Sequence, residues 1–301
     1  MNSKGWILVI GCLLIAHNSR AVKHFVTLNA QVGEHSWLTK TDAVSANSSF
    51  GIGGGIGVNY ELQQRHFLFS AGLAANPSYS VFTLEPYQIA FEGYDTQLDQ
   101  LFYTYKFYDR TDAYTNLSLQ VPIMVGGQFD RFYFLVGAKL DLSLFARAKA
   151  STLVATTGKY PQYIGAFHDM IEHAFFTDYP VEMRNNFTFN LNALASVELG
   201  VRLGDNYKLT GFGSKEKSKI QYRIAVYADY GLLNSIPAQP IPLYSTPTVF
   251  NEADMYSQVQ IMDLVHSAGR DRVAPLQVGV KFTVLFRVGD PKKCVICQAD
   301  D

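Results

Sequence analysis

The stretch Leu276-Gln-Val-Gly-Val-Lys-Phe-Thr-Val-Leu-Phe-Arg-Val288 decides the fold, because alternate residues form two unlike surfaces. Every second residue from Leu276 to Val288 is apolar, whereas the residues between them include Gln277, Lys281 and Arg287. A period of two predicts a strand with two different faces. The stretch has 13 residues, and a tilted strand needs about 9–11 to cross a bilayer. The apolar face would form the core of a soluble sandwich or would meet lipid in a membrane barrel, so the rest of the chain must decide.

Seven other segments repeat the two-faced pattern, and each is predicted to be a strand. They are His24–Gly33, Phe50–Tyr60, a segment that starts at His66, Asn116–Phe129, Phe132–Ala148, Phe187–Leu203 and Ile220–Leu232. In the second segment, the glycines at 51, 53, 55 and 57 share the face opposite the apolar residues. We expect them to make room for larger side chains across the interior.

The connections between these segments alternate in length. Short or medium ones are predicted at 61–65, 130–131 and 204–219, and long ones at 34–49, 78–114, 151–186 and 234–273. This alternation predicts a transmembrane up-and-down antiparallel β-barrel of eight strands, with tight periplasmic turns and long extracellular loops. Ten strands are the alternative, if Leu101–Tyr108 forms a further hairpin with Tyr79–Leu84. A soluble lipocalin-like barrel would put the apolar set of residues inside. Charged residues such as Lys139 and Glu198 recur in the opposite, polar set, and this favours the membrane barrel.

The N-terminal residues 1–21 have the features of a secretory signal peptide. Lys4 supplies a positive charge, Trp6–Ala16 is an apolar run of 11 residues, and Ser19-Arg20-Ala21 has the spacing of a cleavage site. We expect the barrel to occupy residues 22–289 and a periplasmic tail to occupy residues 290–301.

A net charge of −1 and a pI near 6.7 give no electrostatic case for a nucleic-acid partner.

The signal peptide, the strand–loop rhythm and the segment Asn116–Ile123 resemble outer-membrane β-barrel proteins of Bacteroidota and, more broadly, the porin-like family of OmpA-type transmembrane barrels. Gln277, Gly279, Phe282 and Val284 resemble the terminal-strand signal read by the barrel assembly machinery, although an aromatic residue is common where Val284 stands. The resemblance implies a place in the outer membrane of a Gram-negative bacterium. It also implies outer-membrane lipid and the assembly machinery as partners, but no particular activity.

Nine charged residues are predicted to face the lumen. An eight-stranded barrel is just wide enough for side chains to fill it, and buried charges are tolerable only when they are paired. We therefore predict an ion-pair network that holds the lumen closed; a gate or a narrow ion path is the alternative. The predicted network consists of Lys139, Asp141, Arg147, Glu198, Arg202, Arg223, Asp229, Lys281 and Arg287.

Motifs for catalysis or metal binding fall short of their required spacing. His168 and Glu172 lie one helical turn apart, but the inverted zincin motif needs H-x-x-E-H. His266 and Ser267 are adjacent, whereas in outer-membrane phospholipases a residue separates the two. The segment from Gly51 to Gly57 lacks a nucleotide-loop pattern. The sequence therefore predicts no catalytic residue, no metal and no cofactor.

Cys294 and Cys297 form a CxxC pair in the predicted tail, where a small disulfide is favoured over a redox pair.

The predicted function is a non-enzymatic outer-membrane barrel that acts as a structural or partner-binding subunit of an envelope complex through its loops or tail. A small porin-like channel is the alternative, and an outer-membrane lipid-acting enzyme is a remote one.

Overall fold

The computed structural model is all-β, and most of its residues belong to one antiparallel sheet of ten strands. It describes residues 22–39, 46–64, 66–94, 98–159, 177–203, 207–209, 215–217, 220–235, 244–245, 260–261 and 273–288. The strands of the main sheet are β1 (Val22–Thr39), β2 (Ala46–Gln64), β3 (Phe67–Leu84), β4 (Tyr87–Tyr94), β5 (Gln100–Phe129), β6 (Phe132–Lys159), β7 (Tyr179–Phe187), β8 (Asn192–Leu203), β11 (Ile220–Gly231) and β14 (Val273–Val288). Two further sheets have two strands each; one is the hairpin of β9 (Tyr207–Leu209) and β10 (Lys215–Lys217), and the other pairs β12 (Tyr244–Ser245) with β13 (Gln260–Ile261).

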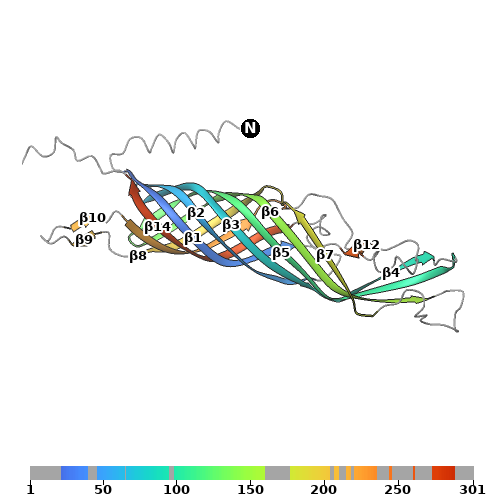
Figure 1. Ribbon diagram of the computed structural model, residues 1–301. Helices are drawn as coiled ribbons and strands as arrows, with labels where there is room; N and C mark the ends of the chain where they lie inside the picture. The colour runs from blue at the N-terminus through green and yellow to red at the C-terminus, as the bar shows by residue number, and fades with distance from the viewer. Residues whose placement is uncertain are drawn as a thin grey trace, which may run out of the picture.

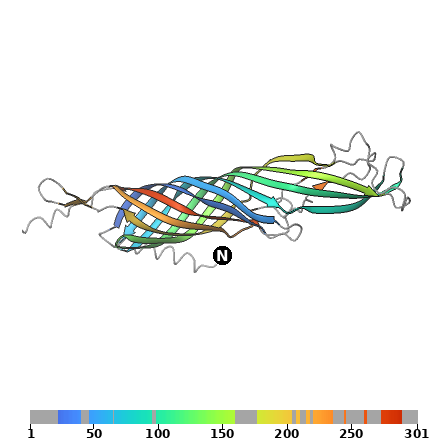
Figure 2. The same cartoon turned by 90° about the horizontal axis from the view of Figure 1, so that it is seen from below.

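Eight of the ten strands close into a ring, which confirms the predicted up-and-down antiparallel barrel. The order is β1, β2, β3, β5, β6, β8, β11 and β14, and β14 pairs again with β1. Figures 1 and 2 show these long strands wrapped obliquely around a common axis. The remaining two, β4 and β7, lie beside β5 and β6 outside the ring. The ten-strand alternative is wrong in its pairing, because Tyr79–Leu84 pairs with Arg110–Thr115 of β5.

The register of the ring fixes the tilt of its strands. Val26 pairs with a residue of β2, which pairs with a residue of β3, and so on around the ring. The last step returns to β1 at Ser36, so the stagger of the barrel is ten residues. Eight strands with this stagger must tilt by about 40° to the barrel axis. The interior of such a barrel is narrow enough for side chains to fill.

The two ends of the barrel differ. The tight turns after Gln64 and Phe129 lie at the same end as the start of β1 and the end of β14, because Val22 pairs with Gln64 and His24 with Val288. Within this turn end, the backbone N–H of Gln128 donates to the carbonyl of His66 at 2.7 Å. We call the opposite end the loop end.

At the loop end the strands run further than the sequence predicts. Residues 102–108 of β5 pair with residues 153–159 of β6, and β4 pairs with the other edge of β5. This three-stranded arrangement, which we call the distal ribbon, projects well beyond the ring (Figure 1, right). Much of the long connections expected at 78–114 and 151–186 is therefore strand.

The ring is apolar outside and polar inside. On β14, Val278, Val280 and Phe282 face outward with 43–49% of their surface exposed, whereas Gln277 and Thr283 face inward and are at most 6% exposed. Water-soluble barrels have the reverse arrangement, and membrane barrels have this one. The distribution contradicts the lipocalin-like alternative.

The predicted strand Phe187–Leu203 is two strands in the structure. β7 ends at Phe187, and β8 begins at Asn192. Between them Phe189 is buried against the ring of Trp37, and the N–H of Asn190 donates to the carbonyl of Ser235 at 2.8 Å. These two contacts hold residues 188–191 outside the hydrogen-bonded ladder of the main sheet.

A β-bulge reverses one predicted inward residue. Leu117 of β5 pairs with Phe145, but Ser118 pairs with Ser143, so Leu144 is an extra residue on β6. Leu144 and Phe145 therefore both face outward, and the alternation shifts by one position. Arg147 is exposed on the outer face as a result, which makes its assignment to the lumen wrong.

Several predicted features lie outside the described residues. They are the signal peptide, the tail with Cys294 and Cys297, and the motifs at His168, Glu172, His266 and Ser267. Among the residues that the structure describes, no helix is long and apolar enough to cross a membrane.

Candidate functional site

Three buried ion pairs cross the interior of the ring. Their nitrogen–oxygen distances are 2.7–2.8 Å, and all six side chains are at most 11% exposed. Each pair joins strands that are not neighbours in the ring but lie two or three places apart, because their inward side chains meet in a narrow lumen. The pairs are Arg223 with Glu61, Lys281 with Glu198, and Lys139 with Asp229.

The pair nearest the turn end is Arg223 with Glu61. The guanidinium also donates from Nη2 to Oε1 of Gln128 at 3.2 Å, and its central carbon lies 4.7 Å from the ring centroid of Tyr133. Gln63 donates to the same Gln128 oxygen at 3.2 Å. A guanidinium held on several sides in this way is fixed in position.

Glu61 was missed by the sequence analysis, which assigned it to a short turn. Its carboxylate faces inward because β2 continues to Gln64. The sequence does contain a signal for an inward Glu61, since Asn59, Glu61 and Gln63 continue the alternation of the inward glycines.

The middle pair uses both carboxylate oxygens of Glu198. Oε2 accepts from the Lys281 ammonium at 2.8 Å, and Oε1 accepts from the Tyr133 hydroxyl at 2.7 Å. Two good donors compensate a buried carboxylate for the water it has lost. Tyr133 therefore contacts both the middle pair and the pair at the turn end.

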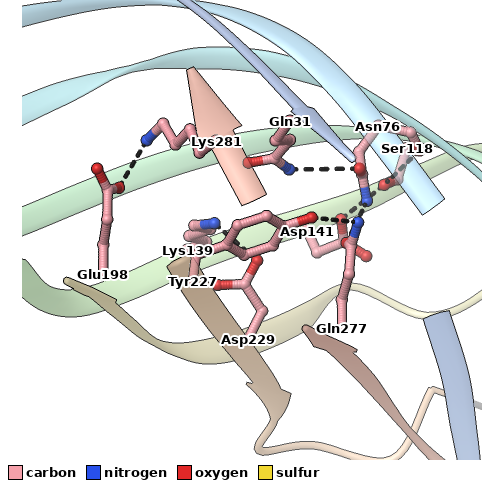
Figure 3. Close-up of polar contacts among 10 residues, drawn as sticks. All are labelled: Gln31, Asn76, Ser118, Lys139, Asp141, Glu198, Tyr227, Asp229, Gln277 and Lys281. Carbon is pink, nitrogen blue, oxygen red and sulfur yellow. Dashed lines mark hydrogen bonds and ion pairs between the residues drawn. The ribbon is translucent and has the colours of Figure 1, made fainter. Parts of the chain in front are cut away.

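The third pair lies next to a chain of amide side chains. Lys139 donates to Oδ2 of Asp229 at 2.7 Å, and its ammonium lies 5.4 Å from the Tyr227 ring centroid. Figure 3 shows the side chains arranged along the lumen, with Glu198 and Lys281 at one side of the view and the amides at the other. The amide hydrogen bonds run from Gln31 to Asn76 at 3.5 Å, from Asn76 to Gln277 at 3.2 Å and from Gln277 to the Tyr227 hydroxyl at 2.9 Å.

The inward glycines of β2 accommodate these polar side chains, as the sequence predicts. A Cβ at Gly53 would lie 2.8 Å from Nε2 of Gln277, and one at Gly57 would lie 2.9 Å from Oδ1 of Asn29. Neither separation leaves room for a methyl group without a shift. The glycine run is therefore a packing feature of the lumen and not a nucleotide loop.

An apolar cluster, which we call the aromatic cap, closes the interior at the loop end. The rings of Trp37 and Phe189 stack at 4.5 Å between centroids, and Phe82 meets Tyr114 edge to face at 5.6 Å. The cap consists of Trp37, Phe82, Leu84, Tyr114, Ala146, Ala148, Phe189 and Val273. The cap and the ion pairs below it thus place packed side chains at several levels along the lumen.

A further buried pair lies at the base of the distal ribbon. Arg110 Nε donates to Asp112 at 3.1 Å, and Arg110 Nη1 donates to the Tyr87 hydroxyl at 2.6 Å. Burial lowers the pKa of Arg110, but Asp112 and Tyr87 together raise it more, so that the pKa lies above its ordinary value. Arg110 therefore stays charged and ties β4 to β5.

Five of the nine predicted lumen residues form the three pairs, and three others lie elsewhere inside. Asp141 accepts from the Ser118 hydroxyl at 2.7 Å. Arg202 and Arg287 are half-buried near the turn end, where Arg202 donates to the carbonyl of Asp130 at 3.0 Å.

The residues of the predicted assembly signal are divided between the two faces of β14. Gln277 and Gly279 face inward, and Phe282 and Val284 face outward. Recognition by the assembly machinery stays a prediction.

Within the described part of the chain, no group of three or more His, Cys, Asp or Glu side chains could hold a metal ion.

No family model and no curated protein matches this sequence. Among solved structures, the chain is similar to the deltaS2 mutant of the TodX monoaromatic hydrocarbon channel, with 8% identity over 89% of this chain and 90% of that chain and a TM-score of 0.17. It is also similar to the secretin InvG of the Salmonella SPI-1 type III secretion injectisome, with 10% identity over 99% of this chain and 74% of that chain and a TM-score of 0.09. Similarities this weak carry no functional argument, which must come from the barrel itself.

Proposed function

We propose that this chain is a non-enzymatic outer-membrane β-barrel that serves as a structural or partner-binding subunit of an envelope complex. The observation that carries the proposal is the contrast between a filled lumen and a large projecting ribbon. A lumen crossed by three ion pairs and capped by aromatic side chains offers little space to a solute, whereas the distal ribbon extends beyond the ring as a hydrogen-bonded sheet. The assignment to an OmpA-like, porin-like barrel of Bacteroidota type belongs to the same proposal.

The outer surface supports the membrane part of the proposal. On β6 the outward residues from Phe132 to Phe145 are apolar, and the next one, Arg147, is charged. At a tilt of about 40° this segment spans roughly 30 Å, which matches the hydrocarbon core of a bilayer. Exposed aromatic residues lie at both ends of the belt, with Phe129 near the turns and Tyr79 near the loops.

The test of the partner-binding role is purification of the tagged chain from native outer membranes in mild detergent, with mass spectrometry of what co-purifies. The informative variant replaces residues 85–109 by a two-residue turn, because Leu84 and Arg110 are already paired across β3 and β5. This removes β4 and the whole ribbon part of β5, residues 102–108, and keeps the strands of the ring. The matched control deletes the β9–β10 hairpin, which lies at the opposite end (Figure 1).

We expect a stoichiometric partner that is lost with the ribbon and kept without the β9–β10 hairpin. Loss of the partner in both variants would mean that the ribbon is not the specific binding surface. A clean monomer in the outer-membrane fraction would contradict the subunit role, and recovery from the soluble periplasm would overturn the membrane barrel.

A small channel is the second candidate, and the polar lining of the lumen favours it. Planar-bilayer recording separates the two functions. We expect no stable conductance from the purified wild type, and we expect Glu198→Gln to weaken the fold because it leaves the Lys281 charge unpaired. Stable conductance whose ion selectivity changes in Glu198→Gln would establish the channel instead.

A further inference from the structure

A small polar cavity lies in the lumen between the Lys139–Asp229 pair and the aromatic cap. It is lined by both carboxylates of this region, Asp141 and Asp229, together with Ser118, Gln120, Gln277 and His35. The cavity has a volume of about 10 Å³, which is room for one water molecule. The cavity is therefore suited to a single water molecule or a single small ion.

The charges around the cavity do not balance. Asp229 binds the ammonium of Lys139 at 2.7 Å, whereas the described hydrogen-bond donors to Asp141 are neutral, the Ser118 hydroxyl at 2.7 Å and the Gln120 side chain. Of the other cations inside the ring, Arg223 and Lys281 are each bound to a carboxylate of their own, and Arg202 and Arg287 lie near the turn end and do not line the cavity. One negative charge remains over Asp141 and Asp229, and an uncompensated buried charge is expensive.

Polar atoms without partners line the same space. Among the described residues, Oδ1 of Asp229 is buried and has no hydrogen-bond partner, and the Asp229 side chain is only 2% exposed. Nδ1 of His35 is likewise buried without a partner, and His35 is 4% exposed. Buried groups of this kind are normally satisfied, so the free carboxylate oxygen indicates that something occupies the cavity.

We propose that the cavity binds one small monovalent cation, such as Na⁺, between the carboxylates of Asp141 and Asp229. The available ligands are oxygens from carboxylate, amide and hydroxyl groups, which suit a hard cation. A single positive charge neutralises the excess, whereas a divalent ion would leave one positive charge in its place. The ion would link β6 to β11 above the last ion pair, and the inference stands apart from the proposed envelope role because it concerns only the ring interior.

The experiment uses the purified mature barrel in detergent and Na⁺ itself as the probe. Equilibrium dialysis against ²²Na⁺ at pH 8 measures bound ions, and thermal unfolding is compared in NaCl and in choline chloride at equal ionic strength. The test variant is Asp141→Asn, which keeps the size of the side chain and removes the excess charge. The control is Glu182→Gln, since Glu182 is 50% exposed on β7 and lies outside the ring.

We expect about one Na⁺ per wild-type chain and a saturable rise of the unfolding midpoint in NaCl over choline chloride. Both effects should disappear in Asp141→Asn and persist in Glu182→Gln. Absence of bound ²²Na⁺ in the wild type would overturn the proposal, whether or not Asp141→Asn folds. A midpoint that depends on pH but not on Na⁺ would also overturn it, because a proton on Asp141 or His35 would then balance the charge.

Discussion

At the scale of single residues, the pair between Arg223 and Glu61 is the most deeply buried of the three. Both side chains are at most 3% exposed, so Arg223→Met would leave the Glu61 carboxylate without its cation in the interior. We expect this to lower the free energy of unfolding by about 3–5 kcal/mol. Reversible urea unfolding in lipid vesicles, followed by tryptophan fluorescence, measures the loss.

The control is an ion pair on the outside. Arg184 and Glu182 are 70% and 50% exposed, so Arg184→Met should cost less than about 1 kcal/mol. Adding Glu61→Met to Arg223→Met should restore much of the lost stability, because the unpaired charge is then gone. Equal losses in Arg223→Met and Arg184→Met would mean that the interior pair is hydrated.

Gly279 offers a second prediction at this scale, because it belongs to the predicted assembly signal and also to a close backbone contact. A Cβ at Gly279 would lie 2.2 Å from the carbonyl oxygen of Val32, whereas one at Gly53 would meet the end of the Gln277 side chain at 2.8 Å. The backbone cannot move aside as a side chain can. We expect Gly279→Ala to lower the unfolding free energy by about 1–3 kcal/mol and Gly53→Ala to lower it less.

Refolding of the purified Gly279→Ala chain into lipid, without assembly machinery, measures this effect. A refolding yield equal to that of the wild type, together with poor assembly in cells, would show that Gly279 acts through recognition. A reduced yield in pure lipid would assign the defect to packing.

Alternation in the sequence predicted which side chains face inward but not which ones meet. Lys139 and Asp229 were both predicted to face the lumen, and in the structure both are buried and pair with each other at 2.7 Å. Their partnership depends on the stagger of the ring, which no local pattern encodes. Arg147 was misplaced because a single extra residue in β6 shifts the faces, and Leu144 carries no sequence signal for a bulge.

At the scale of elements, the bulge in β6 makes a prediction about deletions. Leu144 is extra to the ladder, and removing it keeps Ser143 and Ala146 inward and Phe145 outward. Deleting Leu199 from the regular strand β8 would instead turn every residue on one side of the deletion to the wrong face. We expect the barrel without Leu144 to fold and the barrel without Leu199 to fail.

Resistance to unfolding by SDS without heating, read as faster migration in a gel, distinguishes the two deletions. If both variants fold, strand register is not set by the two-faced pattern in this chain. If neither folds, the bulge itself is required, for example to aim Ala146 and Ala148 into the aromatic cap.

The lengths of the elements were the least predictable part of the fold. The sequence ended the fifth strand at Ala148, whereas β6 continues to Lys159 because β5 pairs with it over that whole length and β7 pairs with its other edge as far as Val154. Beyond the apolar belt the two-faced pattern is no longer needed, since both faces can meet water or other loops. A pattern read for lipid contact therefore cannot detect strand in the distal ribbon.

At the scale of the whole molecule, the eight-strand ring was predictable because loop lengths alternate along the entire chain. That rhythm depends on where the chain turns and not on any single contact. The stagger of ten residues was not predictable, since it emerges only when β14 closes on β1. The overall orientation of the barrel rests on the same rhythm, with the short turns at one end and the distal ribbon at the other (Figure 2).

This orientation, together with the proposed lipid contact, predicts which outer positions touch acyl chains. Val136 lies near the middle of the apolar belt on β6 with 43% of its surface exposed, and Arg147 lies just beyond the belt on the same strand. We expect a fluorophore on Val136→Cys to be strongly quenched by lipids brominated in the acyl chains, and one on Arg147→Cys to be weakly quenched. Both variants are made with Cys294 and Cys297 replaced by Ser.

A second belt position controls for local effects on β6. Leu199 on β8 pairs directly with Phe134, close to Val136, and is 55% exposed, so Leu199→Cys should be quenched as strongly as Val136→Cys. Strong quenching at all three positions would mean that the membrane reaches past the charged residues into the base of the ribbon. Quenching at none would mean that the apolar belt is covered by protein, and the barrel would then be packed inside a complex without a lipid-facing wall.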